Sequence, residues 1–534
     1  MRMTNKIMRN NSIYNINQNK ILQDQLTNQM TSQSKIVRPS DDPVVAIRAL
    51  RLRNNVTTVT QYNEKNAEDA KQWLKLTADA LLTINSVLDG LYEQAETSAN
   101  KYQTSDGLKI LLEQMDSLTK EFYASGNVDY AGRFIFSGYR TDTPVTFTSE
   151  DIREMEKHPR SFEIEEKLNY KQISTINYTN YDVVDGPILT SDTTSYEQGV
   201  TNKDLYRFRL SYEALDADSI QIQDKDGNIL KMDAQGNTTC TDKDGNPLPA
   251  GHPLNDITIT QYQNPEAAYK AVADGSCTGI AFCPSSGELV FGQDFYKNNL
   301  KEGDEFTFTY NKSSWVDGDV NPVHYFKCTE TKDIGDGTMT DVRKTAYNTR
   351  EKQEGKDQDI YYDVGFNQQI QVNSRADEVF THDVGRDMDD FKHCLKELQG
   401  IETKKKEIED KMKEFPEDSA EYKDYDRRLK AVSKAEDYIR ENIHQKFENQ
   451  ITKYQQYQDD TRVAMTNNAT RQSRLDLIST RLTNQQATFK ELQTDNEGID
   501  VTEVAVELTS SEMTYSAALM ATSKIMQTSL MNYI

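Results

Sequence analysis

Residues 513–534, MTYSAALMATSKIMQTSLMNYI, constrain how the ends of this chain must fold. Lys524 is the only charged side chain in this stretch, although the whole protein carries a net charge of -24. Apolar residues recur at helical spacing from residue 501 onward, at Val501, Ala505, Leu508, Tyr515, Leu519, Met526, Leu530 and Tyr533. The spacing predicts a coiled-coil-like helix whose stripe must be covered by the N-terminus or by other copies of the chain.

The N-terminus is the predicted partner for this helix. Residues 3–35 also carry apolar side chains at helical spacing, including Met3, Ile7, Leu22 and Leu26. A polar helix of this length is marginally stable alone, so it needs a partner. We therefore predict that residues 1–38 pack with residues 495–534 as one helical domain.

A turn that contains two prolines separates the first helix from the next. Pro39 should end the first helix, because the residue before a proline avoids helical geometry. Ser40 or Asp41 can cap the following helix, Asp42 adds a carboxylate, and Pro43 fits its first turn. Helical spacing then continues to about residue 124, with a break near residues 104–107 that predicts a second helix capped at Ser105 or Asp106.

The middle of the chain has strand character. Alternating runs such as SIQIQ, DITITQYQ, ELVFG and EFTFTY predict half-buried strands between residues 145 and 372. Helical spacing returns near residue 377, and Pro416 splits a highly charged stretch into a helical hairpin. The predicted fold class is α+β, in which a β-rich outer domain (residues 149–375) is inserted into a helical rod (residues 39–148 and 376–494).

Composition excludes several classes of partner. The acidic balance argues against nucleic acid and against an anionic membrane surface, because like charges repel. No segment is long and apolar enough to predict a transmembrane helix, and the first residues lack the apolar core of a secretory signal peptide. Five irregularly spaced cysteines predict free thiols, with one internal bridge as the alternative.

Catalytic and metal-binding patterns are weak. Asp41 and Asp42 are adjacent carboxylates, but a helix cap explains them. The repeated DKDGN segments at 224–228 and 242–246 suggest calcium loops, yet their twelfth positions are Gln235 and Pro253 rather than Glu, so hairpin turns are favoured. No histidine pair has ligand spacing, and no nucleotide-binding or nucleophile-elbow motif is present. We predict no enzyme activity, no cofactor and no metal.

Four segments carry a resemblance to a known family. They are RPSDDPVVAIRALRLR at 38–53, GRFIFSGYRTDTPVTF at 132–147, VGFNQQIQVNSRADEVF at 364–380, and the region from about 471, with RLDLISTRLTNQQATFKELQ and the ending SLMNYI. In this order they resemble the flagellin-like hook–filament junction proteins, the hook-associated protein 3 family. Residues 150–360 and the hairpin at 402–440 depart from any pattern of that family, which leaves their surface roles open.

The resemblance implies a structural axial component of the bacterial flagellum. It implies a ring of about eleven copies between hook and filament. The implied partners are the chain itself, the other hook-associated junction protein or the hook, filament flagellin, and an export chaperone that holds the C-terminal helix. The implied location is extracellular, after type III export without a cleaved signal peptide.

Nine residues are the predicted assembly contacts: Met3, Ile7, Leu22, Leu26, Leu508, Tyr515, Leu519, Met526 and Leu530. Two other functions stay open at this stage. A minor flagellin would be distributed along the filament, and a secreted adhesin or glycan-binding protein would use the β insertion for binding and the helices as a stalk. The stalk should tolerate loss of the last twenty or so residues, whereas an axial subunit should not.

Overall fold

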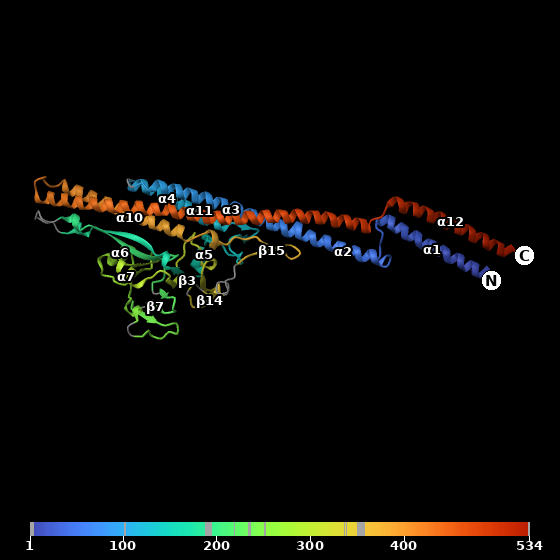
Figure 1. Cartoon of the computed structure of the whole chain (residues 1–534), viewed down its shortest axis with the longest axis horizontal. Coiled ribbons are helices and arrows are strands. Elements are labelled where there is room, and N and C mark those ends of the chain that lie inside the picture. The colour runs from blue at the N-terminus through green and yellow to red at the C-terminus, as the bar shows by residue number, and fades with distance from the viewer. Residues whose placement is uncertain are drawn as a thin grey trace. The chain divides into compact units, whose positions relative to one another are not determined.

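The computed structural model describes residues 5–100, 103–186, 195–217, 219–232, 236–249, 252–335, 337, 339–349 and 358–531. The chain divides into two compact units. The first unit contains residues 1–72, 361–370 and 471–534, and the second contains residues 73–360 and 371–470. Figure 1 shows the order of the elements along the chain.

The first unit contains the two ends of the chain. Helix α1 (Asn5–Ser32) and helix α12 (Val501–Met531) contact each other along their length. The bridge between Ser34 and Gly498, which lies where both helices meet their connectors, is antiparallel. In Figure 1 the two helices lie side by side, with the two ends of the chain at the same end of the pair. The predicted pairing of the N- and C-terminal helices is therefore present within one chain.

Three consecutive helical segments follow α1. They are α2 (Pro43–Thr60), the π-helical segment η1 (Gln61–Ala67) and α3 (Glu68–Ser98). The prediction that Ser40 or Asp41 caps α2 is wrong, because the Asp42 carboxylate accepts the backbone N–H groups of Val44 and Val45. Pro43 does occupy the first turn, as predicted. Strands β15 (Tyr361–Gly365) and β16 (Gln368–Gln371) form a hairpin, which contacts η1 through β15.

Long helices of the second unit flank the β-rich region in sequence. They are α4 (Ser105–Ala124), α10 (Asp383–Met412) and the first part of α11 (Ala420–Glu497). Pro416 lies between α10 and α11, as predicted for a helical hairpin. The cap of α4 is Thr104, one residue before the predicted Ser105, because its hydroxyl accepts the Gly107 N–H.

The β-rich region contains two large sheets. The five-stranded sheet has the order β4-β5-β11-β10-β9, and the seven-stranded sheet has the order β14-β13-β3-β12-β6-β7-β8. The five strands of the first sheet are β4 (Ser174–Asn180), β5 (Thr201–Arg209), β9 (Ile259–Gln261), β10 (Ile280–Cys283) and β11 (Glu288–Phe291). The seven strands of the second are β3 (Arg160–Asn169), β6 (Gln221–Gln223), β7 (Ile229–Met232), β8 (Thr238–Thr241), β12 (Glu305–Lys312), β13 (Lys327–Asp333) and β14 (Val342–Tyr347).

Short elements fill the remaining connections of the second unit. The strands β1 (Asp129–Tyr130) and β2 (Arg133–Phe134) form a small hairpin. The short α-helices are α5 (Ser149–Lys157), α6 (Pro265–Asp274), α7 (Gln293–Asn299) and α9 (Ala376–Val379). The 3-10 turns are η2 (Ser125–Asn127), η3 (Tyr170–Gln172), η4 (Asp182–Asp185), η5 (Tyr196–Gln198), η6 (Pro253–Asp256) and η7 (Pro322–His324). Sequence patterns did not predict α5, α6 and α7.

Side-chain alternation places the core on both faces of the five-stranded sheet. Leu289 and Phe291 of β11 belong to the large core that this sheet shares with the seven-stranded sheet. Val290, between them, belongs to a second core that is covered by α6. Successive side chains of a strand point to opposite faces, so β11 serves both cores at once. This double burial explains the uninterrupted apolar run in LVF.

Several sequence predictions are confirmed by these elements. The fold class is α+β, with long helices at both ends and a β-rich insertion. The first DKDGN segment forms the β6–β7 hairpin turn with Gly227 at φ 90°, which glycine adopts without strain. All five cysteines are free thiols, as predicted. Apart from these predictions, none of the helices among the described residues combines the length and the hydrophobicity of a membrane span. The three-domain division stays a prediction.

Candidate assembly surface and buried charge network

The seam between α1 and α12 follows a repeat of three and four residues. Along α12 the least exposed side chains include those of Val504, Leu508, Ser511, Tyr515, Ala518 and Thr522. Along α1 they include those of Met8, Ser12, Ile16, Asn19, Gln23 and Leu26. This spacing is that of a coiled-coil seam, but several of the positions are polar. The pair is therefore weakly held by its own seam.

Large apolar side chains cover the outer faces of the same helices. On α12, Val506, Met513 and Met520 are spaced by seven residues and are each between 64% and 67% exposed. On α1, Ile13, Tyr14 and Ile21 are also exposed. A soluble chain rarely leaves such a large apolar surface uncovered, so this surface is the candidate assembly surface.

The predicted assembly residues divide between the seam and the outer faces. Leu26 is buried, and Leu508 and Tyr515 are half-buried, so these three belong to the seam. Ile7, Leu22 and Leu519 are between 44% and 49% exposed. Met3 lies outside the described residues. Met526 and Leu530 lie in α12, but their side chains are outside what the structure describes.

Sequence analysis missed Val506, Met513 and Met520. The reason is that α12 carries two apolar stripes of helical spacing, and the predicted stripe is the one that includes Leu508 and Tyr515. The second stripe has a clear signal in the sequence, because its members recur every seven residues. Only the position of α1 shows which of the two stripes is left in solvent.

The PSDDP segment forms an elbow between α1 and α2. Asp41 Oδ2 accepts the backbone N–H groups of Val37 and Arg38, at 3.1 and 2.8 Å. Asp42 caps α2, so the two adjacent carboxylates have different structural roles. Pro39 and Ser40 are exposed in the turn. The motif therefore bonds to the chain's own backbone, as expected for a capping turn.

The elbow is joined to the connector between α11 and α12. The Lys35 N–H donates to the Glu497 carbonyl at 2.7 Å, and Lys35 Nζ donates to the Asp495 carbonyl at 3.1 Å. The Arg53 guanidinium forms a two-pronged ion pair with the Glu497 carboxylate. A Cβ at Gly498 would lie 2.6 Å from the Thr494 carbonyl oxygen, so this connector requires glycine. Both connectors are thus fixed to one another where the terminal helix pair begins.

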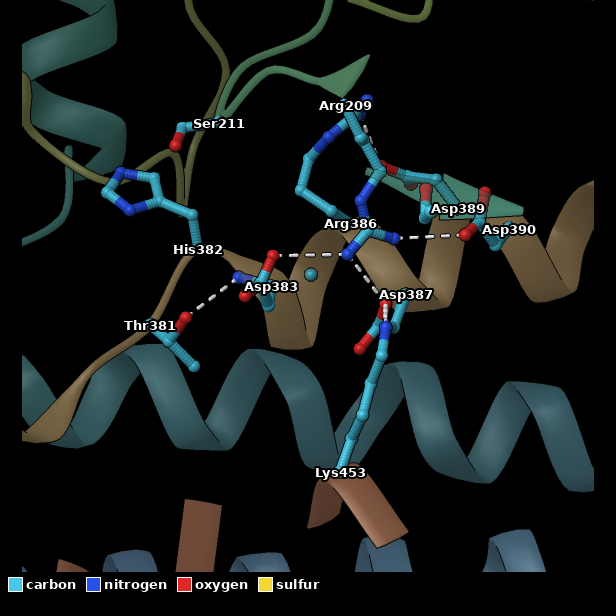
Figure 2. Close-up of polar contacts among 12 residues, drawn as sticks. Arg209, Ser211, Thr381, His382, Asp383, Arg386, Asp387, Asp389, Asp390 and Lys453 are labelled. Carbon is cyan, nitrogen blue, oxygen red and sulfur yellow. Dashed lines mark hydrogen bonds and ion pairs between the residues drawn. The ribbon is translucent and has the colours of Figure 1, made fainter. Parts of the chain in front are cut away.

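A buried charge network lies in the second unit, and part of it is shown in Figure 2. The Arg209 guanidinium pairs with Asp387 at 2.7 Å and with Asp390 at 2.9 Å. The Asp387 carboxylate also accepts from Gln450 at 2.8 Å and from Lys453 at 2.9 Å. These contacts connect β5, α10 and α11.

A second buried arginine extends this network into the sheet. Arg207 Nη2 lies 2.5 Å from the Asp390 carboxylate, and Nη1 pairs with Glu288 of β11. The Glu288 carboxylate also accepts from the Tyr269 hydroxyl of α6 at 2.5 Å. The Asp383 carboxylate, which is more than half exposed, pairs with Arg209 at 3.1 Å at the edge of the network. The charge network comprises Arg207, Arg209, Glu288, Asp383, Asp387, Asp390 and Lys453.

Two carboxylates in the charge network stay ionised despite their burial. Burial alone would raise the pKa of Asp387, but Arg209 and Lys453 outweigh it and hold that pKa below its usual value. Burial acts likewise on Asp390, where Arg207, Lys446 and Arg209 hold the pKa well below its ordinary range. Each charge is matched by opposite charges, so the network clamps helices to the sheet and offers no free base or nucleophile.

A local pattern in the sequence could have indicated this network. Arg207 and Arg209 are two residues apart on a strand and so share one face. Asp383, Asp387 and Asp390 are spaced by four and three residues and so share one face of α10. Nothing in the sequence says that these two faces meet, because Arg209 and Asp383 lie 174 residues apart in the chain. Only the folded chain brings the two faces together.

Comparison with known families gives the broader similarity first. Residues 3–141 match the family model described as the bacterial flagellin N-terminal helical region. This match covers α1, the elbow and the helices up to α4, so the N-terminal part of the chain is similar to that of bacterial flagellins.

The particular relatives are hook-associated proteins. The chain is 28% identical over 116 residues to flagellar hook-associated protein 3 of Escherichia coli strain K12, which is 22% of this chain and 36% of that relative. The chain thus matches about a third of the length of this curated relative. The predicted resemblance to hook-associated protein 3 and the flagellin-like family is confirmed.

Solved structures with related names align over most of the chain. The flagellar junction protein FlgL from Legionella pneumophila is 11% identical with a TM-score of 0.24, covering 81% of this chain and 99% of that one. FlgL from Xanthomonas campestris is 10% identical with a TM-score of 0.26, and the alignment covers 83% of this chain and 99% of that one. Both TM-scores are below 0.5, so these two similarities carry no conclusion about the present chain.

Removing one carboxylate should destabilise the second unit. We expect Asp387→Ala to lower the free energy of unfolding by about 3–5 kcal/mol, because it removes one of the two buried carboxylates that neutralise Arg209 and also the carboxylate that Lys453 pairs with. Denaturant unfolding followed by circular dichroism measures this change. Asp459→Ala is the control, because Asp459 pairs with Arg462 on the exposed surface of α11. Equal stability of Asp387→Ala and the wild type would show that the charge network does not hold the fold.

Two histidines should make the second unit sensitive to acid. Burial and Arg386 lower the pKa of His382 to about 3, and burial lowers the pKa of His324 to about 4. Both are neutral in the fold at pH values where the unfolded chain is protonated. Stability should therefore fall as the pH drops below about 6.5, by at most about 1.4 kcal/mol per pH unit for each histidine.

The measurement is the unfolding free energy between pH 7 and pH 4. The double variant His324→Gln/His382→Gln should show a shallower loss of stability than the wild type. Asp389 acts in the opposite direction. Burial raises the pKa of its carboxyl group to about 6, so the folded chain binds a proton there more readily than the unfolded chain does, and this stabilises the fold as the pH falls. Parallel pH profiles for the variant and the wild type would exclude the histidines as the cause.

Proposed function

We propose that this chain is a structural axial component of the bacterial flagellum and forms the adaptor ring at the hook–filament junction. The observation that carries the proposal is the uncovered apolar surface of the α1–α12 pair, with Val506, Met513 and Met520 on α12. The flagellin-type N-terminal region and the similarity to hook-associated protein 3 support the same role.

The driving force of assembly is the removal of this surface from water. Covering one large apolar side chain that is two-thirds exposed contributes about 1–2 kcal/mol. Each subunit offers several such side chains on each terminal helix, and the polar seam between α1 and α12 adds little stability by itself. Neighbouring copies in a ring of about eleven would supply the cover, as expected for a closed symmetric assembly.

Export and partners belong to the same proposal. The subunit would leave the cell through the flagellar type III apparatus, with a chaperone covering the C-terminal helix until export. The free thiols of the chain suit this route, because no cross-link has to be broken before unfolding. The hook side and the filament side would each contact one end of the ring. A structural role requires no catalytic residue, and we propose no enzyme activity.

Immunogold electron microscopy of detached flagella tests the location. With an antibody to residues 150–360, we expect label in a narrow band between hook and filament. Label along the whole filament would instead make the chain a minor flagellin. Absence of label from the flagellum would leave the hypothesis of a secreted stalk with a binding module, and the junction role would be wrong.

Charge on the assembly surface should block incorporation. We expect Leu519→Asp and Met520→Asp to abolish incorporation into flagella, because assembly would bury an unpaired carboxylate. Leu519→Met and Met520→Leu are the matched controls, because they keep the apolar area. Incorporation is scored as the fraction of flagella that carry label. Normal incorporation of both aspartate variants would refute the assignment of this surface.

A further inference from the structure

The π-helical segment η1 is continuous with the helices on both sides. Thr60, Gln61 and Glu68 all have helical φ and ψ angles, so the chain does not break at either boundary. A π turn closes its hydrogen bonds over one residue more than an α turn. Residues 61–67 therefore hold one residue that a regular helix between α2 and α3 would not need. Such turns are rare and often occur at functional sites.

Hairpin β15–β16 supports η1 on one side. Asn66 Nδ2 donates to the Asp363 carbonyl at 2.7 Å, and the Tyr362 hydroxyl donates to the Asp69 carboxylate at 2.6 Å. Gln61 Nε2 donates to Asn66 Oδ1 at 3.1 Å, which orients the Asn66 amide toward the hairpin. The hairpin therefore bonds the π segment and the first turn of α3.

Helix α11 supports η1 through another set of polar contacts. Asn63 accepts from Ser479 at 3.0 Å and donates to Thr483 at 3.2 Å. Gln486 Nε2 donates to Thr60 and to Glu64, both at 2.8 Å. Hydrogen bonds of this kind depend on register, because a shift of one residue moves each side chain about 100° around the helix.

An open groove lies beside the same segment. Its volume is about 440 Å³, and Val59, Tyr62, Phe366, Leu482 and Phe489 are among the residues that line it. Phe366, at the tip of the hairpin, is 85% exposed. The π segment is therefore clamped by polar contacts but has free space next to Tyr62, into which a rotating helix can move.

We propose that residues 61–67 are a register joint, in which hairpin β15–β16 and α11 hold a surplus residue in a π turn. Release of the clamp converts the segment to regular α-helix. That change rotates α2 by about 100° and shifts it by about 1.5 Å relative to residues 68–72. The rotation thereby changes the direction in which the exposed side chains of Val44, Ile47 and Leu50 point, because these three residues share one stripe of α2.

The use of this joint rests on the proposed function. An adaptor between two different axial structures must fit two sets of neighbours with one sequence. A joint with two discrete registers offers two orientations of one surface without unfolding either helix.

Deletion of one residue tests whether the surplus residue exists. Lys65 is exposed in η1, and Asn54 is exposed in the regular helix α2. Deleting Lys65 should leave the helix content unchanged and slow amide exchange across residues 61–67 by about tenfold, because regular helical bonds replace the π turn. Deleting Asn54 should speed exchange in α2, because it breaks the register of an ordinary helix. Loss of protection in both deletions would overturn the joint.

The clamp has its own test. Tyr362→Phe combined with Asn66→Ala should slow amide exchange in residues 61–67 by at least about threefold, because the released segment becomes regular α-helix, and should leave α12 unaffected. Tyr14→Phe, at an exposed position of α1, is the control. Unchanged exchange in η1 would show that the hairpin does not hold the π turn.

Incorporation into flagella separates the joint from the proposed function. Cells that lack the natural protein receive either the wild type or the Lys65 deletion. If the wild type is incorporated and the deletion is not, the two registers matter for assembly. If both are incorporated equally, the joint is not used and the junction role stands. If the wild type is absent from flagella, the proposed function fails irrespective of the joint.

Discussion

The antiparallel contact between α1 and α12 joins the first and last helices of one chain, and the first unit is organised around it. Each of these two helices would be unstable as an isolated helix in water, because many of its seam positions are polar. Their connectors are fixed by the Lys35 contacts to residues 495 and 497 and by the Arg53–Glu497 ion pair. Because the inner faces of the two helices contact each other, their outer apolar faces stay exposed, and under the proposed function neighbouring copies cover them. The contact between α1 and α12 thus also determines which apolar faces of the two helices stay exposed.

The second unit uses a different source of stability. Its β-rich region has two apolar cores, one on each face of the five-stranded sheet. The helices α10 and α11 are attached to that sheet through the charge network as well as through apolar packing. Buried ion pairs add less net stability than apolar contacts, but removing one partner is costly. Arg207 and Arg209 on β5 therefore specify where α10 lies along the strand, because a shifted helix would leave buried charges unpaired.

Particular residues show how far the sequence could be interpreted. The helix boundaries near Pro39, Pro416 and Val501 were predictable, because proline and cap chemistry act within a few residues. The predicted cap of α2 lies one or two residues too early, since Ser40, Asp41 and Asp42 can all cap and only the backbone geometry selects Asp42. The charge network was missed because its two faces lie 174 residues apart in the chain. The π segment was missed because its residues, QYNEKNA, have no feature that distinguishes them from an ordinary polar helix.

Local sequence patterns are enough to establish that both ends are amphipathic helices, that the middle is β-rich, and that the chain resembles the hook-associated branch of the flagellin-like proteins. These properties follow from residue spacing, from turn residues and from quoted motifs, all of which act over short stretches. The folded chain alone selects which stripe of α12 faces α1 and which stays in solvent. Both stripes have helical spacing, so periodicity cannot rank them, and the choice depends on contacts between residues almost the whole chain apart.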